Sequence, residues 1–248
     1  MEQFWSFFAF PLNLLLAAIW YGVWWMLWRN HRDKAVVRFM LSPAATVSSI
    51  CILSGLSLWI GVTGDRTFSQ SVLFVCALLY VLTVLFLVTL RGWRRPDGCI
   101  RWRFLLIHCG FMLALGAGFW GSPDSSEMRV KLGKGETARE AYRLDGGTGI
   151  LSYELELKDF TLKYGMDGKP AHYEAVICVD GEAPVCILVN HPYNVKFGED
   201  IYLASVSESG CIFQIVREPW RYFAIVGILM LIAGAIILIL KGPRRSFS

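Results

Sequence analysis

The stretch Phe104–Gly121 reads FLLIHCGFMLALGAGFWG and contains one histidine but no Asp, Glu, Lys or Arg. A helix crosses the apolar core of a bilayer, about 30 Å thick, with about 20 predominantly apolar residues. The stretch therefore predicts a membrane-spanning helix. Four further apolar runs predict four more spans: Phe4–Trp28, Phe39–Gly64, Ser71–Leu90 and Tyr222–Leu240. We expect an integral membrane α-helical bundle with five spans.

Arginine and lysine residues are concentrated in segments that lie on one side of these spans. They occur in the loops 29–38 and 91–103 and in the tail after the last run, whereas the loop 65–70 contains only Arg66. The positive-inside rule places such basic segments in the cytoplasm. The C-terminus is therefore expected in the cytoplasm, and the hydrophilic segment 122–219 is expected outside it.

The net charge of +4 is the sum of an acidic segment and a basic remainder of the chain. Residues 121–218 contain 16 acidic and 10 basic side chains, a net charge of −6, so the rest of the chain carries +10. Orientation in the membrane and attraction to anionic lipid of the cytoplasmic leaflet account for that basic excess. Membrane lipid is therefore an expected partner. Nucleic acid is not, because no soluble segment combines a basic patch with aromatic residues.

The predicted domain organisation has three parts. Residues 1–121 form a four-span bundle, residues 122–219 form an extracytoplasmic β-rich domain, and residues 220–248 form the last span with a basic tail. The middle part contains short apolar or alternating runs separated by Gly, Pro, Asp and Asn, which are typical of strands and turns. These runs are Met128–Lys134, Ile150–Leu157, Phe160–Tyr164, Tyr173–Val179, Val185–Val189, Ile201–Val206 and Ile212–Val216. An all-β sandwich or open barrel is expected, with a helix at Thr137–Arg143.

Two cysteines of this domain flank a predicted turn. The residues Asp180–Pro184 separate two apolar runs and predict a hairpin with a five-residue loop. Pairing of Val179 with Val185 would place Cys178 directly opposite Cys186, with Cβ atoms about 4.5–5.5 Å apart. These two cysteines are candidates for a disulfide outside the cytoplasm. The alternative of free thiols stays open, as does the redox state of the third cysteine of the domain, Cys211.

His108 is the candidate ligand residue of the predicted spans. An ionisable side chain within a span is costly, and a functional role is its default interpretation. A neutral imidazole binds haem iron or relays protons, and Met112 lies four residues further on the same helix face. Arg101 and Arg103, one to two turns earlier, can pair with haem propionates. The alternatives are a histidine packed near the interface and arginines that serve as positive-inside anchors.

The sequence offers no catalytic residues. We find no nucleophile next to a base, no paired carboxylates within a span and no phosphate-binding loop. No Cys-x-x-Cys occurs, and no set of Cys and His residues has the spacing of a zinc site. Enzymatic activity in this chain alone is therefore not expected, and neither is a metal other than haem iron.

Several short segments in the second half of the chain occur in a characteristic order. A span bearing His108 leads into a β-rich segment with a D-F…Y…G-x-P stretch, then an N-x-P…G…Y stretch, then an acidic-Pro entry into the last span. The segments are Phe104–His108, Leu157–Tyr164, Gly168–Pro170, Val189–Pro192, Phe197–Gly198, Ile201–Tyr202 and Glu218–Trp220 with Gly227. Over roughly residues 100–240 this order resembles the ResB/CcsB family of cytochrome c biogenesis proteins.

The resemblance implies a function in the System II machinery of the bacterial inner membrane. In that family the histidine before the outer domain is proposed to hold haem on its way outward, which implies that His108 is an axial ligand of haem b. The attachment chemistry belongs to the partner CcsA, so this chain would act with a CcsA-like protein on apocytochrome c. The alternative is a non-haem membrane scaffold whose β-domain binds an extracytoplasmic partner. The outer domain is smaller than in many family members, and the chain has an additional leading span.

Overall fold

The protein is described from a computed structural model, which covers residues 9–64, 68, 71–121, 124–143, 146–164 and 170–241. The chain divides into two compact units. The helical unit comprises Met1–Pro123 together with Trp220–Ser248, and the β unit comprises Asp124–Pro219. The aromatic residues at positions 4–8, the loop residue Arg66 and the basic tail after residue 241 lie outside the described residues.

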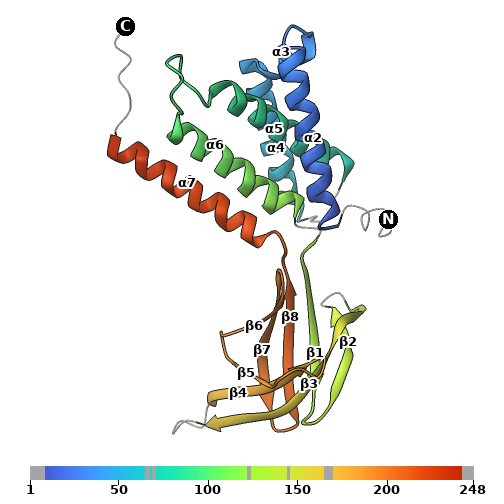
Figure 1. The fold of residues 1–248 in the computed structure, drawn as a ribbon. Coiled ribbons are helices and arrows are strands. Elements are labelled where there is room, and N and C mark those ends of the chain that lie inside the picture. Colours follow the sequence, from blue (N-terminus) through green and yellow to red (C-terminus); the bar gives the residue numbers. More distant parts are fainter. Residues whose placement is uncertain are drawn as a thin grey trace. The chain divides into compact units, whose positions relative to one another are not determined.

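The helical unit consists of long apolar helices joined by short loops (Figure 1). Its elements are α2 (Leu12–Asn30), α3 (Ala35–Met40), α4 (Pro43–Thr63), α5 (Val72–Gly92), α6 (Trp102–Leu115), the π-helical turn η2 (Gly116–Trp120) and α7 (Arg221–Lys241). Serine side chains cap two of the helix starts, because Ser42 Oγ accepts from the Ala45 amide and Ser71 Oγ accepts from the Phe74 amide.

Four of these helices are long and apolar enough to cross a membrane: Pro43–Thr63, Val72–Gly92, Trp102–Phe119 and Arg221–Leu240. They confirm the predicted membrane bundle. The described part of the first expected span, α2, is not among the four. It contains Asn13 and several Trp and Tyr residues, whose amphipathic rings suit the membrane interface better than the hydrocarbon core. The count of five spans therefore stays a prediction.

Helix α2 nevertheless packs within the bundle, against α5. Trp20 Nε1 donates a hydrogen bond to Thr83 Oγ1 over 2.9 Å. One residue further on, the rings of Tyr21 and Phe86 lie 4.8 Å apart between centroids. These contacts combine a polar pair with aromatic packing, so α2 belongs to the folded helical unit.

The helices α6 and α7 lie side by side (Figure 1). They pack closely because glycines face each other. A Cβ atom on Gly110 would lie 2.8 Å from the carbonyl oxygen of Gly227. A Cβ atom on Gly227 would lie 2.7 Å from the amide nitrogen of Ala114. Small residues allow helix backbones to approach in this way within membranes. The glycine pair therefore fixes the distance between the two helices that flank the β unit in the sequence.

The β unit is one eight-stranded antiparallel sheet, and this confirms the predicted all-β character. Its strands are β1 (Ser126–Leu132), β2 (Thr137–Arg143), β3 (Thr148–Tyr164), β4 (Pro170–Val179), β5 (Val185–Leu188), β6 (Tyr193–Lys196), β7 (Glu199–Ser207) and β8 (Gly210–Arg217). They follow the order β5-β4-β3-β2-β1-β8-β7-β6. The chain therefore enters in the middle of the sheet, at β1, and leaves from its neighbour β8.

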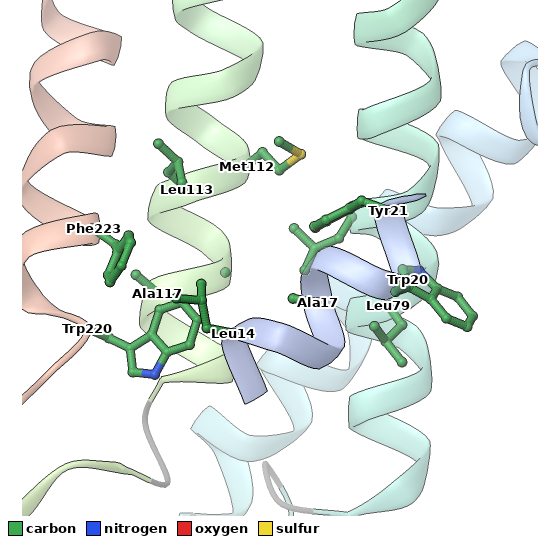
Figure 2. A pocket seen from close by; sticks show the side chains of 12 residues that line it. Leu14, Ala17, Trp20, Tyr21, Leu79, Met112, Leu113, Ala117, Trp220 and Phe223 are labelled. Carbon is green, nitrogen blue, oxygen red and sulfur yellow. The ribbon is translucent and has the colours of Figure 1, made fainter. Parts of the chain in front are cut away.

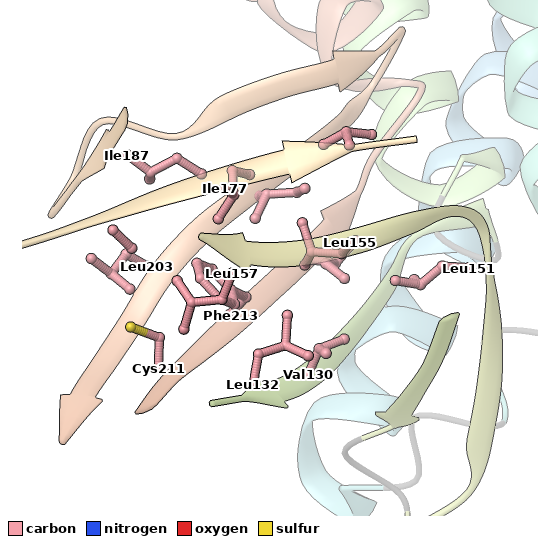
Figure 3. Close-up of a cluster of buried hydrophobic side chains, with 14 of the residues drawn as sticks. Val130, Leu132, Leu151, Leu155, Leu157, Ile177, Ile187, Leu203, Cys211 and Phe213 are labelled. Carbon is pink, nitrogen blue, oxygen red and sulfur yellow. The ribbon is translucent and has the colours of Figure 1, made fainter. Parts of the chain in front are cut away.

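The sheet folds back on itself around one hydrophobic core. Strands β3, β4 and β5 lie close to β7, although none of them is hydrogen-bonded to it. Figure 3 shows side chains from both halves of the sheet pointing into a shared interior. The fully buried members include Leu155, Leu157, Ile177, Phe213 and Ile215. Burial of these alternating residues of β3, β4 and β8 stabilises the fold, since each large apolar side chain contributes about 1.5–3 kcal/mol.

The expected helix at Thr137–Arg143 is wrong, because these residues form strand β2. The strand pairs with β3 on one side and with β1 on the other. Ala141 is buried, whereas Arg139 and Glu140 are exposed, and a bulge interrupts the ladder near Ala138. The local preference of Ala, Arg and Glu for helix amounts to a fraction of a kcal/mol per residue, so two ladders of backbone hydrogen bonds override it.

Candidate functional site

His108 lies on α6, in the second turn, and its side chain is half-buried. The ring nitrogen Nδ1 is 2.9 Å from the carbonyl oxygen of Phe104, one turn earlier. A carbonyl oxygen only accepts hydrogen bonds, so Nδ1 carries the proton and donates. In a neutral imidazole the other nitrogen, Nε2, then keeps its lone pair. His108 therefore presents one unprotonated nitrogen to its surroundings.

The orientation of the imidazole is fixed by an aromatic ring. The rings of Phe104 and His108 are stacked, with centroids 3.8 Å apart and planes inclined by 28°. The Phe104 ring in turn rests on Gly92 at the end of α5, where a Cβ atom would collide with it. A hydrogen bond to a backbone carbonyl and a packed neighbour are the features that hold a ligating histidine in one tautomer and one direction.

The two arginines of the prediction differ in their surroundings. The guanidinium of Arg101 lies 5.0 Å from the centroid of the Phe104 ring, and its Nη1 donates to the carbonyl oxygen of Gly92 over 3.2 Å. The structure thus places Arg101, Phe104 and His108 in one row along α6. Arg103 lies two residues after Arg101 and is half-buried. Arg101 is exposed, so its cation can still reach a carboxylate outside this chain.

Met112 belongs to a separate place in the helical unit. It lines an apolar cavity of about 140 Å³ between α2, α5, α6 and α7, together with Leu14, Tyr21 and Trp220 (Figure 2). His108 is not one of the residues that line this cavity. Pockets for drug-sized ligands measure about 300–1,000 Å³, so this space does not enclose a macrocycle. The structure therefore does not bring Met112 and His108 into a common ligand pocket.

The predicted opposition of Cys178 and Cys186 is wrong. In the β4–β5 hairpin, Val185 pairs with Ile177 and Cys186 pairs with Val176, so the register differs by two residues from the expected one. Cys178 is buried and its thiol contacts the carbonyl oxygen of Glu182, whereas Cys186 is exposed. Both are free cysteines in the structure, and the disulfide prediction loses its geometric basis.

The other motif residues stabilise the β unit. Asp159 forms an ion pair of 2.7 Å with Lys134, and the hydrogen bond from this lysine holds the pKa of Asp159 below its ordinary value. Asn190 has a positive φ of 61°, at the turn between β5 and β6. Glu199 is buried and pairs with Lys196 over 3.2 Å. Asn190 and Glu199 lie at hairpin turns or ends, whereas Asp159 lies within β3 and holds Lys134 of the β1–β2 turn.

Sequence reasoning did not identify Phe104 and Gly92 as part of the candidate site. The spacing of four residues between Phe104 and His108 was a usable signal, because such residues are neighbours on a helix. The contact with Gly92 had no such signal, because it joins two helices. Among the described residues, no group of three or more His, Cys, Asp or Glu side chains is placed to hold a metal ion.

The fold and the site together define a class of protein. Four membrane-capable helices carry one antiparallel β unit, which is inserted in the sequence between the third and the fourth of them. This is a polytopic membrane protein with a single inserted β domain. Residues 98–212 match the model of the ResB-like family, which confirms the resemblance found in the sequence.

Comparison with other proteins adds two findings. The chain is similar in structure to a solved protein named Cytochrome c Heme Lyase CcmF, with a TM-score of 0.47 and 13% sequence identity. The similarity covers 92% of this chain and 40% of that protein, so the chain spans less than half of its length. No curated protein matches the sequence.

Proposed function

We propose that this protein is a membrane subunit of the System II cytochrome c maturation machinery, in which His108 holds haem b in the bilayer. The ResB-like region supports a role in cytochrome c biogenesis. The observation that carries the haem-binding part is the hydrogen bond from His108 Nδ1 to the Phe104 carbonyl oxygen, which leaves Nε2 as a ligand atom. Haem, when bound, supplies an iron centre that takes neutral imidazole as an axial ligand.

The residues of this chain fit one side of a haem. His108 provides one axial ligand, and Arg101 and Arg103 provide cations for the propionates by charge-assisted hydrogen bonds. The apolar cavity between the described helices measures about 140 Å³ and is lined by Met112 but not by His108, so we assign the second axial ligand to the partner. A surface that offers one ligand and no enclosing pocket suits a haem shared with a CcsA-like membrane protein.

The orientation in the bacterial inner membrane follows from the basic loops. Loop 29–38 precedes α4, loop 91–103 joins α5 to α6, and the tail follows α7. Alternation of the four membrane-capable helices puts all three segments on one side, whether or not α2 crosses the membrane, and the positive-inside rule supports the cytoplasm as that side. The β unit then lies outside the cytoplasm, where apocytochrome c is matured. His108 lies near the cytoplasmic end of α6, so haem would enter from the inner leaflet.

The function in this proposal is delivery without catalysis of attachment. The described residues contain no group of three metal-binding side chains, and the sequence has no nucleophile paired with a base. In this proposal the CcsA-like partner performs the attachment. The chain's own residues orient the imidazole, supply cations beside it and present the β unit to partners.

The test is co-purification of the full chain with a CcsA-like protein, followed by the haem spectrum of the complex. His108→Ala should lower the haem content at least about tenfold, since one lost ligand bond of about 1.4 kcal/mol or more has that effect. His31→Ala, which changes an exposed histidine in the loop after α2, is the matched control and should leave haem unchanged. Free imidazole added to His108→Gly should restore a six-coordinate spectrum.

The alternative of a non-haem scaffold predicts a different result. In that case the complex of His108→Ala would carry as much haem as the unchanged chain, and the partner would still co-purify. Equal haem content in His108→Ala and His31→Ala would overturn the ligand role and favour the scaffold.

A further inference from the structure

The apolar cavity between α2, α5, α6 and α7 is a second candidate site of the helical unit (Figure 2). It has a volume of about 140 Å³, and its described lining consists of aliphatic and aromatic side chains, one methionine and one glycine. Helix α2 packs along α5, and α6 packs along both α5 and α7, whereas α2 makes few contacts with α6 or α7. This arrangement leaves the cavity between α2 and the α6–α7 pair.

The lining lies in one half of the helical unit, measured along the helix axes. Leu14 and Phe223 belong to the first turns of α2 and α7, and Leu82 lies about 15 Å from the start of α5. On α6 the lining begins at Met112 and continues to Ala117 in the π-helical turn η2. The hydrocarbon core of a bilayer is about 30 Å thick, so the cavity lies within the depth of one leaflet.

The cavity reaches the surface of the helical unit. Leu14 and Trp20 line it and are at the same time exposed. The indole N–H of Trp20 already donates to Thr83, so the Trp20 ring offers an apolar surface. Three of the four helices around the cavity are long and apolar enough to cross a membrane. In a bilayer, lipid acyl chains therefore border this opening.

We propose that the cavity binds part of an acyl chain of a membrane lipid, which enters between α2 and α7. An apolar cavity of roughly 150 Å³ stays free of water and binds small apolar guests. Contacts between a hydrocarbon chain and the lining side chains are individually weak but together favourable. The π-helical turn that borders the cavity is a rare conformation, found frequently at functional sites. The site is separate from His108, so the proposal does not depend on haem binding.

Two small residues allow the cavity to be filled by mutation. Gly116 lines it with a φ of −62°, and no neighbouring atom lies within 4 Å of an added Cβ. Gly118 in the same π-helical turn is equally open around its Cβ position but is not part of the described lining. Ala17 and Ala18 form a second such pair on α2, because Ala17 belongs to the described lining and Ala18 does not. Leucine at Gly116 or Ala17 should therefore compete with the acyl chain.

Photo-crosslinking of the full chain in lipid nanodiscs tests the proposal. The probe is phosphatidylcholine with a diazirine in the middle of one acyl chain, and mass spectrometry locates the adducts. Adducts on the lining residues Met112 and Tyr21 should fall at least about tenfold in Gly116→Leu and in Ala17→Leu, since the added side chain occupies the same space. Adducts on Ile225, which is exposed on α7, should stay unchanged. Because the two variants fill the cavity from different helices, the test does not depend on the folding of one variant.

The matched controls Gly118→Leu and Ala18→Leu should leave all adducts unchanged. Two results would overturn the proposal: adducts on the lining that are no more frequent than those on Ile225, or an equal loss in the filled and the control variants. Crosslinking of the lining that occurs only after deletion of residues 2–8 would also overturn it, and would assign the cavity to this N-terminal segment of the chain.

Discussion

Replacement of Gly198 by alanine should destabilise the β unit through two separate effects. Gly198 lies between β6 and β7 with a φ of +73°, and its carbonyl oxygen accepts a hydrogen bond from the Glu218 amide over 2.6 Å. A Cβ atom there would lie 2.5 Å from Pro219 Cα and 2.8 Å from Pro219 N. The first effect is the unfavourable positive φ, and the second is a collision with backbone at the end of the unit.

The expected magnitudes separate these effects. A left-handed conformation costs a residue with a Cβ atom about 1–2 kcal/mol. Overpacking against atoms that cannot move adds about 1–3 kcal/mol. Gly181 has nearly the same φ, +76°, but nothing lies within 4 Å of its Cβ position. Gly181→Ala should therefore lose only the conformational contribution of about 1–2 kcal/mol. The two variants should then differ in the free energy of unfolding by the overpacking contribution, about 1–3 kcal/mol.

Urea titration of the full chain in nanodiscs, with pulse proteolysis of the β unit, measures this difference. With an m-value of about 1–3 kcal/mol per molar urea, Gly198→Ala should unfold about 1 M earlier than Gly181→Ala. Equal midpoints for the two variants would refute the reasoning, because the collision with Pro219 would then contribute nothing. The comparison also tests why a glycine stands in the Phe197-Gly198 motif.

Three further predictions follow from the same kind of observation. Gly227→Ala should lower the thermal stability of the helical unit in detergent, whereas Gly55→Ala, where nothing lies within 4 Å of the added Cβ, should not. Burial raises the pKa of Cys211 to about 11 from 9.0, so the unfolded chain ionises this thiol first. The stability of the β unit should therefore fall as the pH rises from about 9 to about 11, and Cys211→Ala should reduce that fall. Alkylation under denaturing, non-reducing conditions should modify both Cys178 and Cys186; a pair resistant to alkylation would contradict the observed hairpin register.

The long elements of the fold were predictable because their signals are local. Runs of about 20 apolar residues require helices in a bilayer, where no other conformation satisfies the backbone. Helix starts were also encoded: α4 begins at Pro43 rather than within the preceding apolar run, because Ser42 caps the helix and Pro43 suits its first turn. Strand β3 was visible from the alternation of Leu151, Tyr153, Leu155 and Leu157, all of which are buried.

The errors arose where partners distant in the sequence decide the structure. Residues 137–143 have helical preferences, but β1 and β3 supply hydrogen-bond ladders on both sides and make them a strand. The β4–β5 hairpin was correctly expected, yet its register was not. Loop length alone did not reveal that Val185 pairs with Ile177, and a shift of two residues keeps the same faces buried, so the hydrophobic pattern gives no warning.

At the candidate site, too, the local feature was predictable from the sequence and the contacts between distant residues were not. His108 was identified from its own position, because an imidazole in a span is costly without a role. Its orientation was not predictable, since the stacked Phe104 ring is held by Gly92 on another helix. The predicted role of Met112 stays a prediction, although the residue lines an apolar cavity whose lining does not include His108. Residues four apart share a helix face, but the neighbouring helices differ from one turn to the next: Met112, Leu113, Gly116 and Ala117 border the cavity beside α2.

The geometry around His108 also bears on why this chain would need a partner. Haem iron has two axial positions, and His108 supplies one oriented imidazole with a free Nε2. A protein that stores haem surrounds it, because an enclosed macrocycle is shielded on both faces. A single ligand on the surface of α6, with the exposed cation of Arg101 in the same row, instead leaves one face for another protein. Under the proposed function, such a half-site would bind haem more weakly alone than in the complex, because the partner would contribute further contacts. The haem affinity of the isolated chain should therefore be much lower than that of the co-purified complex. Equal affinities would mean that the second ligand comes from this chain.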